Sequence, residues 1–159
     1  MTRRTPVVLA LLLATVLPLG GCGGGGSKDS SATTATGPRS PLDIGPRAGD
    51  SPVAAALAAQ GEPLFKKKGC TACHAYGKRL TGPDLRGVTR RRTAQWMEQQ
   101  ILHPEVMVKE DPLSHELFGI YNLQMANQGL TPDEAKAVIE YFKKLDEESE
   151  AKGELAVPK

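Results

Sequence analysis

Two thiols and an imidazole lie close together near the middle of the chain. Cys70 and Cys73 are three positions apart, and His74 directly follows the second cysteine in the stretch GCTACHAY. Thiolate sulfur and imidazole nitrogen both bind metals, and paired cysteines also support redox chemistry. The stretch therefore predicts a metal ion, a dithiol that cycles between two oxidation states, or an attached haem.

The rest of the chain helps to distinguish these three chemistries. A zinc site usually takes four ligands as two separated pairs, and outside this stretch the only histidines are His103 and His115. A thioredoxin-like dithiol needs a βαβ setting, whereas lysines and helical patterns surround this pair. In C-x-x-C-H, each thiol adds to a haem vinyl group and the histidine coordinates the iron. We favour covalent haem, with a dithiol or copper-handling chaperone as the rival.

Helices are predicted on both sides of this motif. Before it, Ser51-Pro52 can begin a helix that Gly61 and Pro63 interrupt, and Pro63 can begin the next one. After it, Thr93 can cap the segment AQWMEQQIL, which Pro104 ends.

The last predicted helix has the clearest signals. TPDE, residues 131–134, is a capping box with proline at the first helical position, and apolar residues follow at helical spacing through residue 145. No segment alternates as a strand would. The sequence therefore predicts an all-α domain.

These stretches resemble the small class I cytochromes c of bacteria. The matching segments are GEPLFKKKGCTACH, TGPDL, TAQWMEQQILHP and YNLQMANQGLTPDEAKAVIEYFKKL, which cover nearly all of residues 53–146 in the family's order. The resemblance implies a cytochrome c-like fold of three to five helices wrapped round one covalent haem c. It also implies that the terminal helices cross, with Leu64 and Phe65 against Ile139 and Phe142.

A haem bound by His74 has a second axial position to fill. The candidates are Met97, Met107, Met125, His103 and His115. We interpret Met97 as a core residue, Met107 as part of a polar loop and the two histidines as surface residues. The resemblance implies Met125, just before the last helix, although Ala126 stands where the family commonly has proline.

Two further residues enter through the resemblance alone. It implies that the Pro83 carbonyl accepts a hydrogen bond from His74, the alternative being an ordinary Gly-Pro-Asp turn. Trp96 is either a core residue or a partner of a haem propionate.

Histidine and methionine together fill both axial positions and leave no site for a substrate. We therefore expect an electron carrier rather than an enzyme, acting between membrane or periplasmic redox partners, alone or as a subunit of a larger oxidoreductase. The alternative is a ligand-binding or sensing module in which the bond to Met125 gives way to a gas.

The start of the chain predicts export. MTRR precedes a short apolar run that ends in LGGC, which resembles the lipobox of bacterial lipoproteins. The resemblance implies a signal peptide of residues 1–21 and lipid on Cys22, hence a membrane-anchored protein facing the periplasm or the cell exterior. The alternative is an ordinary signal peptide.

Composition divides the remainder into three parts. Residues 22–51 are rich in Gly, Ser, Thr and Pro and predict a flexible tether. Residues 52–148 form the cytochrome c domain, and residues 149–159 a solvated tail.

The charge is unevenly distributed along the chain. Residues 62–92 hold nine Lys/Arg against two acids, whereas residues 93–159 hold six lysines against thirteen acids. This split predicts a basic face that docks acidic redox proteins. Export and few aromatics argue against nucleic acid, and we expect a monomer.

Overall fold

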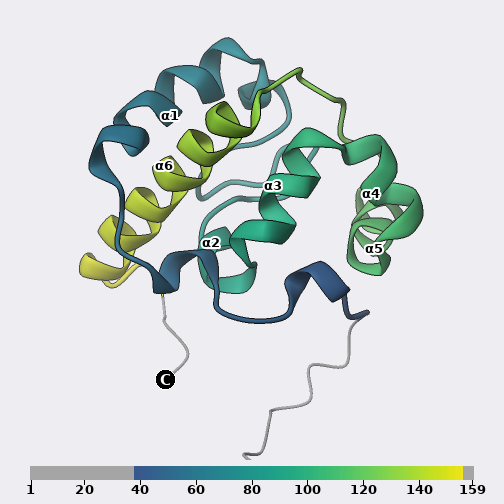
Figure 1. Cartoon of the computed structure of the whole chain (residues 1–159), viewed down its shortest axis with the longest axis horizontal. Coiled ribbons are helices and arrows are strands. Elements are labelled where there is room, and N and C mark those ends of the chain that lie inside the picture. Colours follow the sequence, from purple (N-terminus) through teal and green to yellow (C-terminus); the bar gives the residue numbers. More distant parts are fainter. Residues whose placement is uncertain (1–37, 156–159) are drawn as a thin grey trace, which may run out of the picture. The chain divides into compact units, whose positions relative to one another are not determined.

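The computed structural model of the protein describes residues 38–155, and over this range its regular elements are all helices, joined by loops (Figure 1). The elements, six α-helices and three 3₁₀ helices, are η1 (Pro41–Asp43), η2 (Ala48–Asp50), α1 (Ala55–Lys67), η3 (Cys70–Ala72), α2 (Val88–Arg91), α3 (Ala94–Leu102), α4 (Pro104–Glu110), α5 (Pro112–Tyr121) and α6 (Pro132–Ala151). The all-α prediction is confirmed, with more α-helices than the three to five expected.

Helices α1 and α6 lie side by side and cross closely (Figure 1). A Cβ at Gly61 would collide with the carbonyl oxygen of Ala137, so only glycine allows this approach of the two backbones. The expected pair of Phe65 and Phe142 is present, edge to face with ring centroids 5.1 Å apart. The expectation for Ile139 is wrong, because this residue packs in a separate cluster around Trp96.

The predicted break before Pro63 is also wrong, since α1 runs unbroken from Ala55 to Lys67. A proline inside a helix removes one hydrogen bond and costs about 3 kcal/mol. Pro63 faces solvent, while Ala58, Gly61 and Phe65 are buried on the other face of α1. Burial of that face against α6 offsets the cost of the proline.

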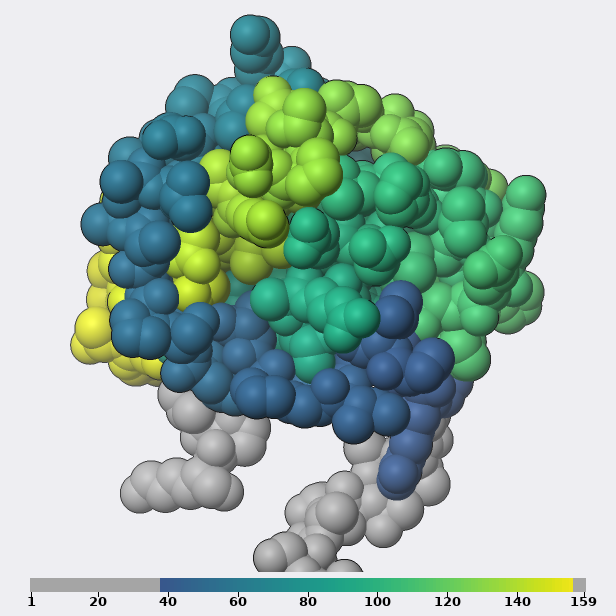
Figure 2. Space-filling model, in the orientation of Figure 1, coloured from purple at the N-terminus to yellow at the C-terminus, as the bar shows by residue number. Residues whose placement is uncertain are grey.

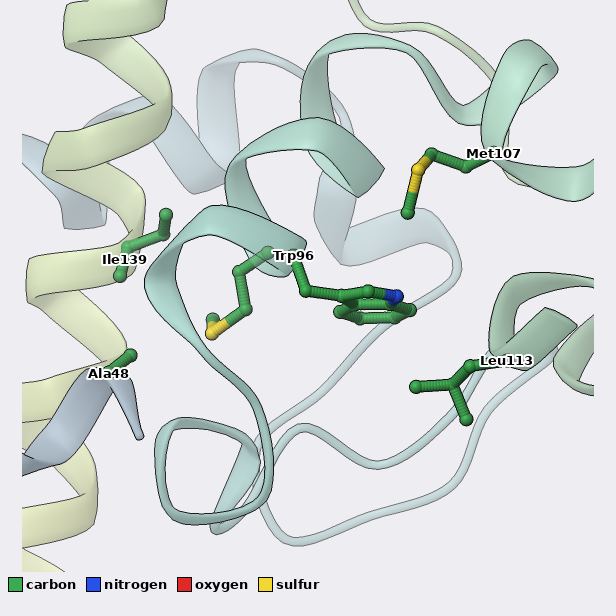
Figure 3. Packing of buried hydrophobic residues seen from close by; sticks show 6 residues of the cluster. Ala48, Trp96, Met107, Leu113 and Ile139 are labelled. Carbon is green, nitrogen blue, oxygen red and sulfur yellow. The ribbon is translucent and has the colours of Figure 1, made fainter. Parts of the chain in front are cut away.

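The cluster around Trp96 joins α3 to the helices that follow it. Figure 3 shows the indole ring lying between α3 and the side chains of Met107 and Leu113, with Ala48 and Ile139 on the other side of α3. The polar loop expected after Pro104 is instead α4, and a second helix, α5, follows it. Pro104 and Pro112 each occupy the first turn of a helix, where proline is favourable, so the same residue type that ends one helix begins the next.

The predicted tether is wrong for its last part, because residues 40–51 pack on the domain in Figures 1 and 2. The Ala48 amide donates to the Arg92 carbonyl at 2.8 Å. The buried Lys143 ammonium donates to Ser51 Oγ at 3.0 Å and to the Pro52 carbonyl at 2.8 Å. Polar contacts of this kind order a segment with few apolar residues, which composition alone cannot reveal. Residues 22–37 lie outside the described part of the chain.

The predicted boundary at residue 148 is wrong as well, since α6 continues to Ala151. The fully buried Asp146 carboxylate accepts hydrogen bonds from the Gly87 amide at 2.6 Å, the Thr89 hydroxyl at 2.7 Å and the Tyr76 hydroxyl at 2.8 Å. These donors replace water around the charge. They also tie α6 to the segment that follows His74, which is how the end of the chain supports the site.

Candidate haem-binding site

A cavity of about 600 Å³ lies beside the α1–α6 crossing. Pockets for small molecules and cofactors typically measure about 300–1,000 Å³. Phe65, Val138 and Phe142 line it from the two crossing helices, and further walls come from residues 69–92, α3, α5 and the loop before α6. The structure thus encloses one apolar space between segments far apart in sequence.

The two cysteines enter this cavity from the turn that follows α1. Gly69 takes a left-handed conformation, with φ of 75°, that ends α1 and starts η3. The His74 amide then donates to the Cys70 carbonyl at 3.0 Å, which closes the motif into a single turn. Cys70 and Cys73 are free thiols, and burial raises the pKa of the Cys70 thiol.

His74 lines the same cavity. The loop that contains Pro83 holds its ring in position. Its Nδ1 donates to the Pro83 carbonyl at 3.1 Å, which leaves the Nε2 lone pair free. Burial lowers the pKa of His74, and the bond to Pro83 opposes this only in part, so the ring is neutral near pH 7. A Cβ at Gly82 would lie 2.7 Å from Cε1 of this ring, so glycine makes room for it.

Met125 reaches the cavity from the loop between α5 and α6. The loop is fastened to the end of α3 by Asn127, whose Nδ2 donates to the Leu102 carbonyl at 2.9 Å and whose Oδ1 accepts from the Gly129 amide at 2.9 Å. The Gln100 amide Nε2 lies 3.8 Å from Met125 Sδ.

The other axial candidates divide into two groups. Met97 is buried in the cluster around Trp96 and also contributes to the cavity wall. Met107, His103 and His115 are not among the residues that line the cavity. Met107 packs in the Trp96 cluster, and His115 Nδ1 instead lies 3.1 Å from the Val108 carbonyl.

Trp96 lines the cavity, but its indole N–H donates to Asp111 Oδ1 at 3.0 Å. The Arg92 guanidinium lies over its ring, 5.4 Å from the centroid. These contacts engage the ring's only polar atom within the protein. Trp96 thus lies in the buried core cluster and also forms part of the cavity wall.

Sequence reasoning overlooked Gln100 and Asn127. Gln100 follows Trp96 by four residues in α3, so the two lie on the same helix face. A polar residue on that otherwise apolar face could have indicated, from the sequence alone, a side chain that contributes to the site. Asn127 carried no such signal, because nothing local shows that the loop folds back onto α3.

The set of donor atoms decides what the cavity can hold. Among residues 38–155 there is no cluster of three or more His, Cys, Asp or Glu that could hold a metal ion. What converges instead is two thiols, one neutral imidazole and the thioethers of Met97 and Met125 around an apolar space. Thiols can form thioethers with vinyl groups while imidazole and thioether bind iron, so these residues fit a haem.

A family model for cytochrome c matches residues 58–146. The chain belongs to the cytochrome c family. It is 32% identical over 82 residues to cytochrome c-551 of Pseudomonas denitrificans, which covers 52% of this chain and 93% of that protein. It is 49% identical over 35 residues to cytochrome c-551 of Azotobacter vinelandii, which covers 22% of this chain and less than half, 43%, of that protein.

Solved structures of cytochromes c resemble this cytochrome in fold. Cytochrome c from Rhodothermus marinus superposes with a TM-score of 0.59 at 37% identity, covering 61% of this chain and 83% of that one. The cytochrome c domain of a Pseudomonas putida protein gives a TM-score of 0.51 at 32% identity, covering 60% of this chain and 98% of that one. The cofactor of the family, one covalent haem c, is therefore the cofactor of this chain.

No helix within residues 38–155 combines the length and apolar character that a membrane span requires.

Proposed function

We propose that this cytochrome carries single electrons through a haem joined to Cys70 and Cys73, with His74 and Met125 as the axial ligands of iron. The convergence of these four side chains on one apolar cavity carries the proposal. Members of the family carry electrons, and the haem supplies the Fe(II)/Fe(III) couple.

The protein's own residues would hold this group and control its surroundings. The two thiols anchor it, and the hydrogen bond from His74 Nδ1 to the Pro83 carbonyl fixes which ring nitrogen faces iron. The crossing of α1 and α6 supplies an apolar wall that excludes water. With His74 and Met125 both bound to it, the iron would have no open site for a substrate, as an electron carrier requires.

The docking surface we propose is smaller than the nine basic residues of 62–92. Five of these form ion pairs within the domain: Lys66 with Glu62, Lys68 with Glu134, Arg86 with Glu154, Arg90 with Glu150 and Arg92 with Asp43. Within the described residues, Lys67, Lys78, Arg79 and Arg91 have no carboxylate partner, and Arg79 and Arg91 line the cavity. We propose that an acidic redox partner approaches near these last two residues.

Measuring the salt dependence of electron transfer to an acidic partner tests this surface. Arg79→Gln and Arg91→Gln should each reduce the association rate and its sensitivity to salt. Lys66→Gln is the matched control, because Lys66 is already paired with Glu62 at 2.6 Å. Equal effects of all three would contradict the proposed surface.

Export and lipid attachment at Cys22 are further proposals, and they concern residues outside the described part of the chain. They rest on the LGGC sequence after a short apolar run. We expect wild-type protein in the membrane fraction and Cys22→Ser protein in the soluble exported fraction. Mass spectrometry of the mature N-terminus would show the lipid directly, and an unmodified Cys22 would reject this proposal.

Two methionines at one cavity give a sharp test of the axial ligand. We expect the oxidised wild-type cytochrome to show the weak far-red charge-transfer band of a methionine–iron bond. Met125→Leu should abolish the band, whereas the matched control Met97→Leu should keep it. Loss of the band in Met97→Leu alone would assign the ligand to α3. Binding of carbon monoxide by the reduced wild type would favour the ligand-binding alternative.

A further inference from the structure

A buried carboxylate, that of Asp111, lies directly behind the cavity wall. Asp111 is 4% exposed, and its oxygens accept hydrogen bonds from the Trp96 indole N–H at 3.0 Å, the Ser114 amide at 2.9 Å and the Ser40 hydroxyl. Two of these three donors, Trp96 and Ser114, belong to residues that line the cavity. Asp111 is therefore one residue removed from the cavity.

The charge of Asp111 has no counter-ion among residues 38–155. All three hydrogen-bond partners donate to it, which is the pattern of an ionised carboxylate. Asp111 is also the N-cap of α5, and the positive end of a helix favours a negative charge. It takes part in none of the ion pairs of the described residues. Removing a charge from water is costly, so its burial without an opposite charge requires an explanation.

The hydrogen bonds alone do not require a charged residue. Capping α5 needs only a side-chain oxygen that accepts from the Ser114 amide, and asparagine does this about as well as aspartate. An amide oxygen would also accept from the Trp96 indole. The Ser40 hydroxyl can accept as well as donate, so it would bond equally to an amide nitrogen. A neutral side chain could therefore make every hydrogen bond of Asp111, and the charge itself needs another explanation.

We propose that the negative charge of Asp111 lowers the reduction potential of the haem. The oxidised haem carries one positive charge more than the reduced haem, so a fixed negative charge nearby stabilises the oxidised state. The charge acts more strongly across the protein interior than it would through water, because the interior has a lower dielectric constant. The proposal rests on the proposed function, since it requires a redox-active haem in this cavity.

A second buried carboxylate, that of Asp146, shows what distinguishes Asp111. Asp146 is fully buried and accepts hydrogen bonds from Tyr76, Gly87 and Thr89. None of these three residues lines the cavity. We therefore expect the charge of Asp146 to act more weakly on the haem than that of Asp111.

Asp111→Asn in the haem-loaded protein removes the charge and preserves the shape of the side chain. The reduction potential should rise, so that the ratio of reduced to oxidised cytochrome at a fixed solution potential increases several-fold. Glu110→Gln is the matched control, because Glu110 precedes Asp111 and carries the same charge but is exposed, where water and salt screen it. Asp146→Asn should change the ratio less than Asp111→Asn. A ratio in Asp111→Asn that is unchanged, lowered or equal to that in Glu110→Gln would overturn the proposal.

The direction of the change separates a role of the charge from a purely structural role. A loosened pocket admits water, which stabilises the oxidised haem, so structural damage would lower the potential rather than raise it. If Asp111→Asn does not fold, Ser40→Ala decides. It keeps the carboxylate but removes one donor that offsets its charge, so the ratio should fall, and an unchanged or raised ratio would overturn the proposal. Wild-type protein without a reversible one-electron couple would instead reject the proposed function.

Discussion

The two walls of the cavity are built in opposite ways. The wall that carries Cys70, Cys73 and His74 comes from one short segment, closed by hydrogen bonds within residues 69–85. The wall that carries Met125 is a loop without helix, fastened to α3 by Asn127 and touched at the sulfur by Gln100. A group bound covalently at the first wall stays attached when the second opens. The strength of the proposed bond between Met125 and iron should therefore depend on packing between distant segments.

The largest effect is expected at the wall that carries Cys70, Cys73 and His74, which we call the covalent wall. The double substitution Cys70→Ser and Cys73→Ser removes both sulfur atoms that can bond to haem, so no haem should remain with the chain. Haem staining after denaturing electrophoresis and the intact mass measure this loss. Cys22→Ser is the control and should keep its haem. Full haem attachment in the double variant would refute the assignment of the motif.

Two glycines allow the same substitution to be compared across the walls. Gly82→Ala places a Cβ 2.7 Å from His74 Cε1, and overpacking of this kind costs about 1–3 kcal/mol. Gly129→Ala meets no atom within 4 Å and carries only the strain of a φ of 63°, about 1–2 kcal/mol. Gly82→Ala should also disturb the proposed bond from His74 to iron, seen as a loss of low-spin absorption, whereas Gly129→Ala should not. Equal spectral changes in both would remove the distinction between the walls.

Asn127→Ala should loosen the wall that carries Met125, which we call the methionine wall, and leave the covalent wall unchanged. The substitution removes hydrogen bonds to the Leu102 carbonyl and from the Gly129 amide, each worth about 0.5–1.5 kcal/mol. We expect the far-red band to disappear at a lower temperature than in wild type, while the haem remains attached. Gln128→Ala is the control from the same loop. If the temperature at which the band disappears falls no further than in this control, Asn127 does not hold the loop that carries Met125.

The smallest expected effect is a pH dependence of folding stability that arises from Tyr76, two residues after His74. Burial, together with the hydrogen bond to Asp146, raises the pKa of Tyr76 to about 12. The ordinary value in an unfolded chain is about 10. The folded state thus keeps a proton that the unfolded state loses, so this stabilisation is complete below about pH 10 and is lost as the pH rises toward 12.

Tyr76→Phe removes this dependence along with the hydrogen bonds to the Leu145 carbonyl and Asp146. The difference in unfolding free energy between wild type and variant should therefore shrink between about pH 9 and pH 12. Urea unfolding at several pH values measures it. A difference that stays constant over this range would contradict the raised pKa.

The covalent wall and the helices beside it could be predicted because their signals are local. C-x-x-C-H fixes three functional side chains within one turn, and the Thr131 capping box and Thr93 cap begin α6 and α3 as predicted. Each signal depends on residues within a few positions of one another. The resemblance to class I cytochromes c added the crossing helices, of which the pair of Phe65 and Phe142 is present.

Tertiary structure decided what local signals could not. The unbroken α1 depends on Gly61 meeting α6, the ordered segment 40–51 depends on Lys143 and Arg92, and the burial of Asp146 depends on donors some sixty residues earlier in the chain. The contact of Gln100 with Met125 likewise joins a helix to a loop 25 residues away. The sequence by itself predicted the proposed haem-attachment motif, since its geometry is that of a single turn. Only the folded chain decided what holds the methionine wall, because contacts between distant segments exist only once those segments have packed.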